Sequence, residues 1–163
     1  MIYPFCDQVS WYHKSERMNV CGGSIYSEDV IITAAHCCDH FRSWYLTDFE
    51  IIGGELDLSK ESGTEQKHSI KGYKKHPGYV HLESRGKFIR LESDVCLLYL
   101  DTPFDLTQPD ISTIAIAHED PSQSTECLIS GWGKTIVSIC RLHNNFQIVF
   151  KFIFGIPIFQ SYC

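Results

Sequence analysis

The sequence predicts an all-β fold. Short runs of β-branched and aromatic residues recur as far as Trp132, and glycine, proline, aspartate and serine separate them. Short strands with closely spaced turns are typical of an antiparallel barrel or sandwich. Up to Trp132 no stretch has apolar residues at the roughly 3.6-residue spacing of a long helix. Hydrophobic residues make up 44% of the 163 positions and charged residues 21%, so the chain can bury a core.

The predicted strands follow one another with turn residues between them. In order, they are residues 8–12 (QVSWY), 29–33 (DVIIT), 49–52 (FEII), 94–100 (DVCLLYL), 112–117 (STIAIA) and 126–132 (ECLISGW). Residues 33–38 (TAAHCC) suit a single helical turn, because Thr33 can cap it and its two alanines favour helix.

The last part of the chain differs in character. Three prolines between Asp101 and Glu126 indicate a long surface connection. Residues 146–163 are largely aromatic and β-branched, but Lys151, Gly155 and Pro157 interrupt them. This stretch is too short and too broken for the ~20 apolar residues of a membrane span, so we expect an aggregation-prone tail.

Charge and cysteine content narrow the class of protein. The formal net charge is −6 and the lysines and arginines are scattered, so no nucleic-acid partner is expected. Eight cysteines without paired C-x-x-C spacings favour disulfides over a zinc ribbon, and therefore an extracellular, secreted protein. Residues 1–6 (MIYPFC) do not have the pattern of a secretory signal peptide, so that segment is expected to be missing.

Five segments together resemble, in this order, the first half of trypsin-like and chymotrypsin-like serine endopeptidases. They are CGGSIYSEDVIITAAHCC, GELDLSKESGTEQ, HPGY, DVCLLYLDTPFDL and CLISGWGK. The resemblance covers about Gln8 to Lys134. More residues lie between His36 and Asp94 than the family usually has there, so the resemblance implies that residues 80–93 (VHLESRGKFIRLES) form an expanded surface loop. It implies the chymotrypsin-like double barrel, with the first six-stranded antiparallel barrel, of Greek-key type, present and the second truncated. It also implies protein or peptide substrates or a protease partner, and no cofactor or metal.

By this resemblance His36 matches the general base of the family and Asp94 the carboxylate that orients it. An imidazole suits the role because its ordinary pKa, about 6.5, lets it accept and return a proton near neutral pH. Three alternatives stay open. His36 could be a lone surface or metal-binding histidine, Asp94 could be a turn residue, and His36, Cys37, Cys38 and His40 could form a cramped zinc site.

The resemblance also implies a disulfide between Cys21 and Cys37. Cys127 matches a family cysteine whose usual partner lies in a region that this sequence does not resemble. Cys38 and Cys96 are additions to the family pattern, and the apolar run around Cys96 favours a free buried thiol there. The pairing of six cysteines stays open: Cys6, Cys38, Cys96, Cys127, Cys140 and Cys163.

The nucleophile of the family lies in a Gly-Asp-Ser-Gly-Gly-Pro turn of the second barrel. The 163 residues contain no such turn, and neither Ser138 nor Ser161 has flanking glycines, while Ser130 belongs to an expected strand. We therefore predict an incomplete triad and negligible peptidase activity for this polypeptide. The alternative is a non-catalytic protease homologue that acts as a binding or regulatory module.

The predicted organisation has four parts. Residues 1–106 form the first barrel, 107–126 the inter-barrel linker, 127–134 the first strand of the second barrel, and 135–163 a divergent apolar tail. The change of character at about Thr135 suggests a transcript that runs into sequence normally spliced away.

Overall fold

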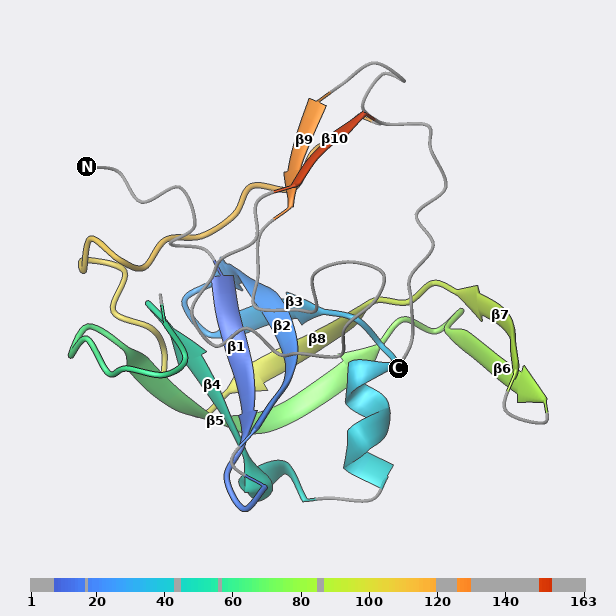
Figure 1. The fold of residues 1–163 in the computed structure, drawn as a ribbon, viewed down its shortest axis with the longest axis horizontal. Helices are drawn as coiled ribbons and strands as arrows, with labels where there is room; N and C mark the ends of the chain where they lie inside the picture. The colour runs from blue at the N-terminus through green and yellow to red at the C-terminus, as the bar shows by residue number, and fades with distance from the viewer. Residues whose placement is uncertain are drawn as a thin grey trace.

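Six antiparallel strands close into a barrel in the computed structural model of this chain (Figure 1). The structure describes residues 8–16, 18–42, 45–55, 57–84, 87–119, 126–129 and 150–153. The barrel strands are β1 (Gln8–His13), β2 (Met18–Ser27), β3 (Val30–Thr33), β4 (Phe49–Gly53), β5 (Gln66–Lys75) and β8 (Cys96–Leu100). Around the barrel their order is β1-β2-β3-β8-β5-β4, and β4 pairs with β1 to close it. The predicted all-β class and closed six-stranded barrel are confirmed.

Alternating side chains of the strands fill the barrel. In β8 the buried residues Cys96, Leu98 and Leu100 alternate with half-buried ones, as expected for a strand with one face toward a core. Trp11 of β1 is 1% exposed and packs edge-on against Phe49 of β4 at a ring-centroid distance of 5.4 Å. Ring contacts of this kind add to the stabilisation from buried area.

Two short 3₁₀ helices and two hairpin-like pairs lie outside the barrel. The helices are η1 (Cys37–Arg42) and η2 (Leu46–Asp48). Residues 80–93, expected to be a surface loop, mostly form the hairpin of β6 (Val80–Ser84) and β7 (Lys87–Glu92), which extends from the barrel in Figure 1. β9 (Glu126–Ile129) pairs with β10 (Phe150–Ile153), so the first part of the strand expected at residues 126–132 pairs with a segment of the predicted tail.

One strand prediction is wrong. Residues 112–117 (STIAIA) form no strand and are exposed throughout. The isoleucine before them, Ile111, is 3% exposed and lies in the core, and the backbone N–H of Ile114 donates to the Ile25 carbonyl at 2.8 Å. This segment therefore runs along the barrel surface, attached at separate points.

Among the described residues, no helix is long and apolar enough to cross a membrane.

Candidate active site

His36 lies in the short connection between β3 and η1. Thr33 ends β3, and its hydroxyl donates to the Gly22 carbonyl of β2 at 2.8 Å. Thr33 is therefore not the helix cap that the sequence suggested, and the helical turn begins later, at Cys37. The Asp39 N–H donates to the His36 carbonyl at 3.1 Å, which closes the turn around the histidine.

Asp94 contacts His36 through both carboxylate oxygens. Asp94 Oδ2 lies 2.7 Å from His36 Nδ1, and Asp94 Oδ1 accepts the His36 backbone N–H at 2.8 Å. The side chains are 27% and 19% exposed, so the pair is shielded from water while one edge of the ring stays accessible. The carboxylate therefore holds both the ring and the backbone of the histidine.

A tight turn just before β8 presents Asp94. Ser93 has a φ of 49°, an uncommon left-handed conformation for a residue other than glycine. The Val95 N–H donates to the Ser93 carbonyl at 2.8 Å, and the Val95 carbonyl accepts the His76 N–H at 2.8 Å. This turn lifts Asp94 out of the strand and toward His36. No motif in the sequence indicated a left-handed conformation at Ser93.

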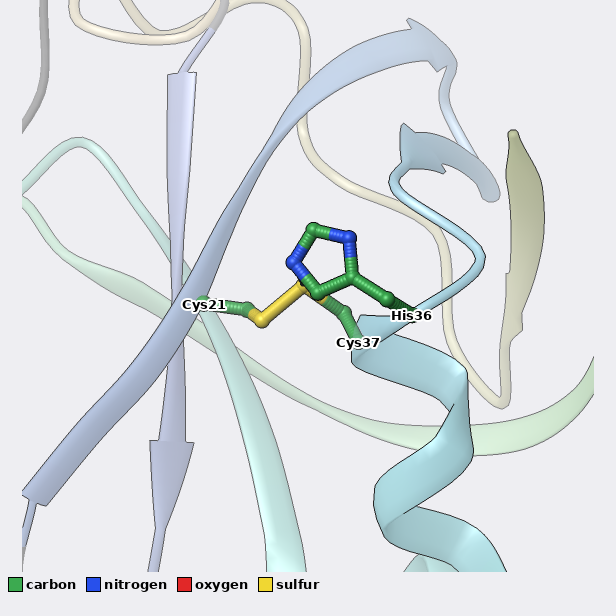
Figure 2. Close-up of side chains that lie close together, drawn as sticks. All are labelled: Cys21, His36 and Cys37. Carbon is green, nitrogen blue, oxygen red and sulfur yellow. Dashed lines mark hydrogen bonds between the residues drawn. A yellow bond between two sulfur atoms is a disulfide. The ribbon is translucent and has the colours of Figure 1, made fainter. Parts of the chain in front are cut away.

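The second ring nitrogen of His36 lies on the side of the Cys21–Cys37 disulfide, as Figure 2 shows. His36 Nε2 lies 3.7 Å from the Cys37 sulfur. The ligand atoms of Cys21, His36 and Cys37 all lie within 4.8 Å of one another, a spacing that a metal ion could bridge. The two sulfurs are bonded to each other, however, and a disulfide offers no thiolate to a metal.

A second disulfide joins Cys38 to Cys96. The expectation of a free thiol at Cys96 is therefore wrong. Cys96 is buried in β8, but that strand passes close beneath η1, and the two Cα atoms are 6.8 Å apart. The zinc alternative at His36, Cys37, Cys38 and His40 also loses its thiolates, since both of its cysteines are in disulfides.

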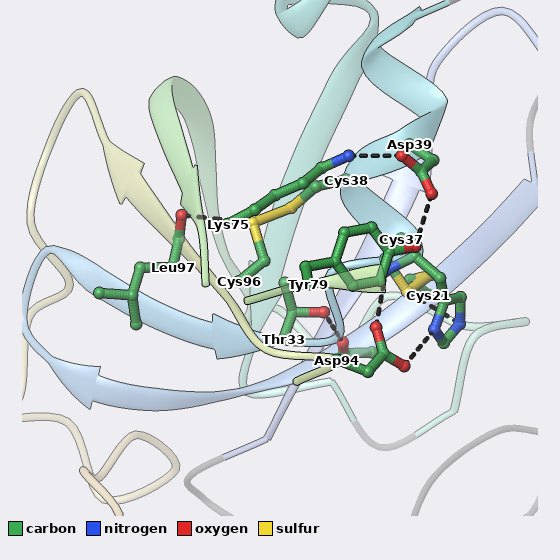
Figure 3. Close-up of a disulfide and its surroundings, with 12 residues drawn as sticks. Cys21, Thr33, Cys37, Cys38, Asp39, Lys75, Tyr79, Asp94, Cys96 and Leu97 are labelled. Carbon is green, nitrogen blue, oxygen red and sulfur yellow. Dashed lines mark hydrogen bonds and ion pairs between the residues drawn. A yellow bond between two sulfur atoms is a disulfide. The ribbon is translucent and has the colours of Figure 1, made fainter. Parts of the chain in front are cut away.

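Asp39 connects η1 to the start of the hairpin (Figure 3). Its carboxylate forms a short ion pair with Lys75 of β5 and accepts the Tyr79 hydroxyl at 2.7 Å. His81 Nδ1 lies 3.6 Å from the same carboxylate. No pattern in the sequence indicated this cluster, because Asp39 lies 36 residues from Lys75 and 40 residues from Tyr79 along the chain.

A neighbouring histidine favours its neutral form. Burial lowers the pKa of His40 below its ordinary value, and the nearby His36 lowers it further, against the opposing effect of Asp39. A neutral His40 adds no positive charge beside the His36 ring.

The predicted site residues fall into two groups. The structure brings together His36, Asp94, Cys21 and Cys37, which the sequence assigned to one site. Ser130, Ser138 and Ser161 lie outside the described residues.

Comparisons with known proteins show which family this chain is similar to. Residues 4–147 match the family described as Trypsin. Kallikrein 1-related peptidase b26 of Mus musculus is 28% identical over 147 residues, which are 88% of this chain and 52% of that protein. Putative trypsin-6 of Homo sapiens is 34% identical over 118 residues, which are 72% of this chain and 42% of that protein. The chain thus spans about half the length of the curated relatives it matches.

A solved structure has the same fold. Neuropsin, described as a serine protease expressed in the limbic system of mouse brain, superposes with a TM-score of 0.74 at 20% identity. The match covers 93% of this chain and 60% of the neuropsin chain.

Proposed function

Because this chain belongs to the trypsin family, we propose that it supplies the histidine and aspartate of a serine endopeptidase site, His36 as general base and Asp94 as its orienting carboxylate. The observation that carries the proposal is the double contact of Asp94 with His36, 2.7 Å to Nδ1 and 2.8 Å to the backbone nitrogen.

The geometry suits a defined sequence of proton transfers. When Nδ1–H donates to Asp94, Nε2 keeps its lone pair and can accept the proton of a serine hydroxyl as that oxygen attacks a peptide carbonyl. The imidazolium that forms is stabilised by the Asp94 carboxylate. It then returns the proton from Nε2 to the leaving amine, and a water molecule repeats the cycle to release the acyl group.

We propose further that this polypeptide of 163 residues hydrolyses peptides negligibly by itself. Acyl transfer needs a nucleophile and backbone donors for the oxyanion, and the family places both in a Gly-Asp-Ser-Gly-Gly-Pro turn that this sequence does not contain. A serine-directed fluorophosphonate should therefore leave the folded chain unlabelled, as followed by intact mass. A stoichiometric adduct mapped to one serine would contradict this.

A chimera tests the roles of His36 and Asp94 directly. Residues 1–134 of this chain would be joined to the second-barrel portion of a trypsin-family relative, beginning after the segment equivalent to GWGK. We expect the chimera to hydrolyse peptide substrates and H36A to abolish the activity. D94N should lower kcat by about 10⁴, since it stabilises the wrong imidazole tautomer.

One control variant and one contrary outcome make the chimera decisive. H40N changes a neighbouring histidine that we place outside the proton transfers, so it should keep most of the activity. A chimera that is active but insensitive to H36A and D94N would overturn the assignment.

We propose that the protein is secreted and extracellular, which the two disulfides support, and that its substrates are proteins or peptides, as its membership of the trypsin family implies.

A further inference from the structure

We propose that the Cys38–Cys96 disulfide positions His36 against Asp94, and that it does so in addition to the Cys21–Cys37 disulfide. The inference rests on the proposed function of the His36–Asp94 pair. Cys38 and Cys96 are positioning residues in this proposal, because they act through the pair and do not touch the reacting atoms.

Both ends of the segment that carries His36 attach to one residue, Cys96. At the upstream end, Thr33 of β3 is the ladder partner of Cys96 in β8. At the downstream end, the Cys38 sulfur is bonded to the Cys96 sulfur. Residues 34–37 therefore form a short loop whose two flanking residues are both fixed to Cys96. A loop this short has few conformations left once both ends are fixed.

Cys96 also lies close to Asp94 in the sequence. Asp94 precedes Cys96 by two residues, so the carboxylate that contacts His36 and the cysteine that fixes the loop lie on one short segment. Cys96 itself is held on two sides, because it pairs with Thr33 of β3 and with Lys75 of β5. The disulfide thus joins the segment that bears the base to the segment that bears its carboxylate.

The other disulfide has a different geometry. Cys21–Cys37 ties the turn to β2, which contributes neither member of the pair. Cys21 is only half-buried, whereas Cys38 and Cys96 are both 0% exposed and lie in the core cluster (Figure 3). Of the two cross-links, Cys38–Cys96 is the one that joins the segment of His36 to the segment of Asp94.

The double variant C38A/C96A tests this while the rest of η1 stays attached. Cys37 is still bonded to Cys21, and Asp39 still contacts Lys75 and Tyr79, so the barrel is expected to fold. The readout is native-state hydrogen exchange of the His36 backbone N–H, which donates to Asp94. We expect this amide to exchange about tenfold faster relative to the amides of the β1·β4 ladder.

The matched control is I111A. Ile111 is 3% exposed and packs against Gly53, whose partner Gln66 is at the opposite end of β5 from Lys75. Its truncation should destabilise the barrel and accelerate only amides that exchange by global unfolding, leaving local protection of the His36 N–H unchanged. D94A, which removes the acceptor, should reproduce the effect of C38A/C96A on the His36 N–H.

Two results would overturn the proposal. One is a His36 amide that exchanges in step with the β1·β4 amides in C38A/C96A, which would indicate a purely global role. The other is loss of the whole barrel in both C38A/C96A and the volume-restoring variant C38V/C96A, because the disulfide would then support the fold and not the pair. Exchange needs no peptidase activity, so an inactive chimera with the expected exchange pattern would contradict only the proposed function.

Discussion

At the scale of single residues, the two glycines after Cys21 have different environments. A Cβ at Gly23 would lie 2.7 Å from Ile31 Cγ2 and 2.9 Å from the Ile32 carbonyl oxygen. A Cβ at Gly22 would meet only the Val9 carbonyl oxygen, at 3.7 Å, an ordinary contact. The backbone oxygen of Ile32 cannot move without disturbing β3, so Gly23 is required by space and Gly22 is not.

We therefore predict that G23A destabilises the barrel and that G22A does not. Overpacking of this kind costs about 1–3 kcal/mol, whereas an exposed substitution stays within about 0.5 kcal/mol. Denaturant unfolding of the two variants and the parent, with equal m-values, measures the difference. Equal stabilities for G22A and G23A would show that the strands can separate to admit a methyl group.

The motifs that resemble the trypsin family pointed to His36 and Asp94 as a pair, and the structure brings their side chains to 2.7 Å, while their catalytic roles stay a proposal. Cys96 was predicted wrongly as a free thiol. The run of apolar residues around Cys96 indicates that its side chain is buried. It does not indicate which cysteine lies next to Cys96, because that depends on the tertiary arrangement of β8 and η1.

At the scale of elements, the strands predicted at residues 8–12, 29–33, 49–52 and 94–100 correspond to β1, β3, β4 and β8 of the barrel. β2 and β5 received no prediction because glycine and lysine interrupt them, although the barrel pairs each of them on both sides. Residues 112–117 had the right composition for a strand but form none, and the closed barrel that they run along leaves no strand edge of its own for them to pair with. Tertiary pairing decided each of these cases over local propensity.

The β6–β7 hairpin is the element we expect to be least stable. Within the part of the chain that the structure describes, its strands pair only with each other, and its side chains Leu82 and Ile89 are 49% and 59% exposed. An isolated two-stranded hairpin is marginal in water, so its amides should exchange through local opening.

Exchange measured at several denaturant concentrations tests this prediction. Hairpin amides should show little dependence on denaturant, while amides of the β3·β8 ladder should follow the m-value of global unfolding. Hairpin amides with the same slope as the barrel would mean that the hairpin unfolds only with the whole domain.

At the scale of the whole molecule, the contacts of the barrel extend beyond the boundary at residue 106 that the sequence predicts for it. We placed the end of the barrel at residue 106 and treated 107–126 as a linker. Beyond that boundary, however, Ile111 packs beside the Phe104 ring at Gly53, and the Ile114 N–H bonds to the Ile25 carbonyl. These contacts suggest that the folding unit includes the first part of the linker.

Two truncated chains separate these possibilities. A chain ending at Glu119 keeps the contacts of Ile111 and Ile114, while a chain ending at Leu106 loses both. Removal of a buried isoleucine and the cavity it leaves costs about 2–5 kcal/mol, a large part of the stability of a small domain. We expect cooperative thermal unfolding for the longer chain and a markedly lower Tm for the shorter one. Equal Tm values would place the boundary at residue 106, as the sequence indicated, because Ile111 would then contribute nothing to the core it touches.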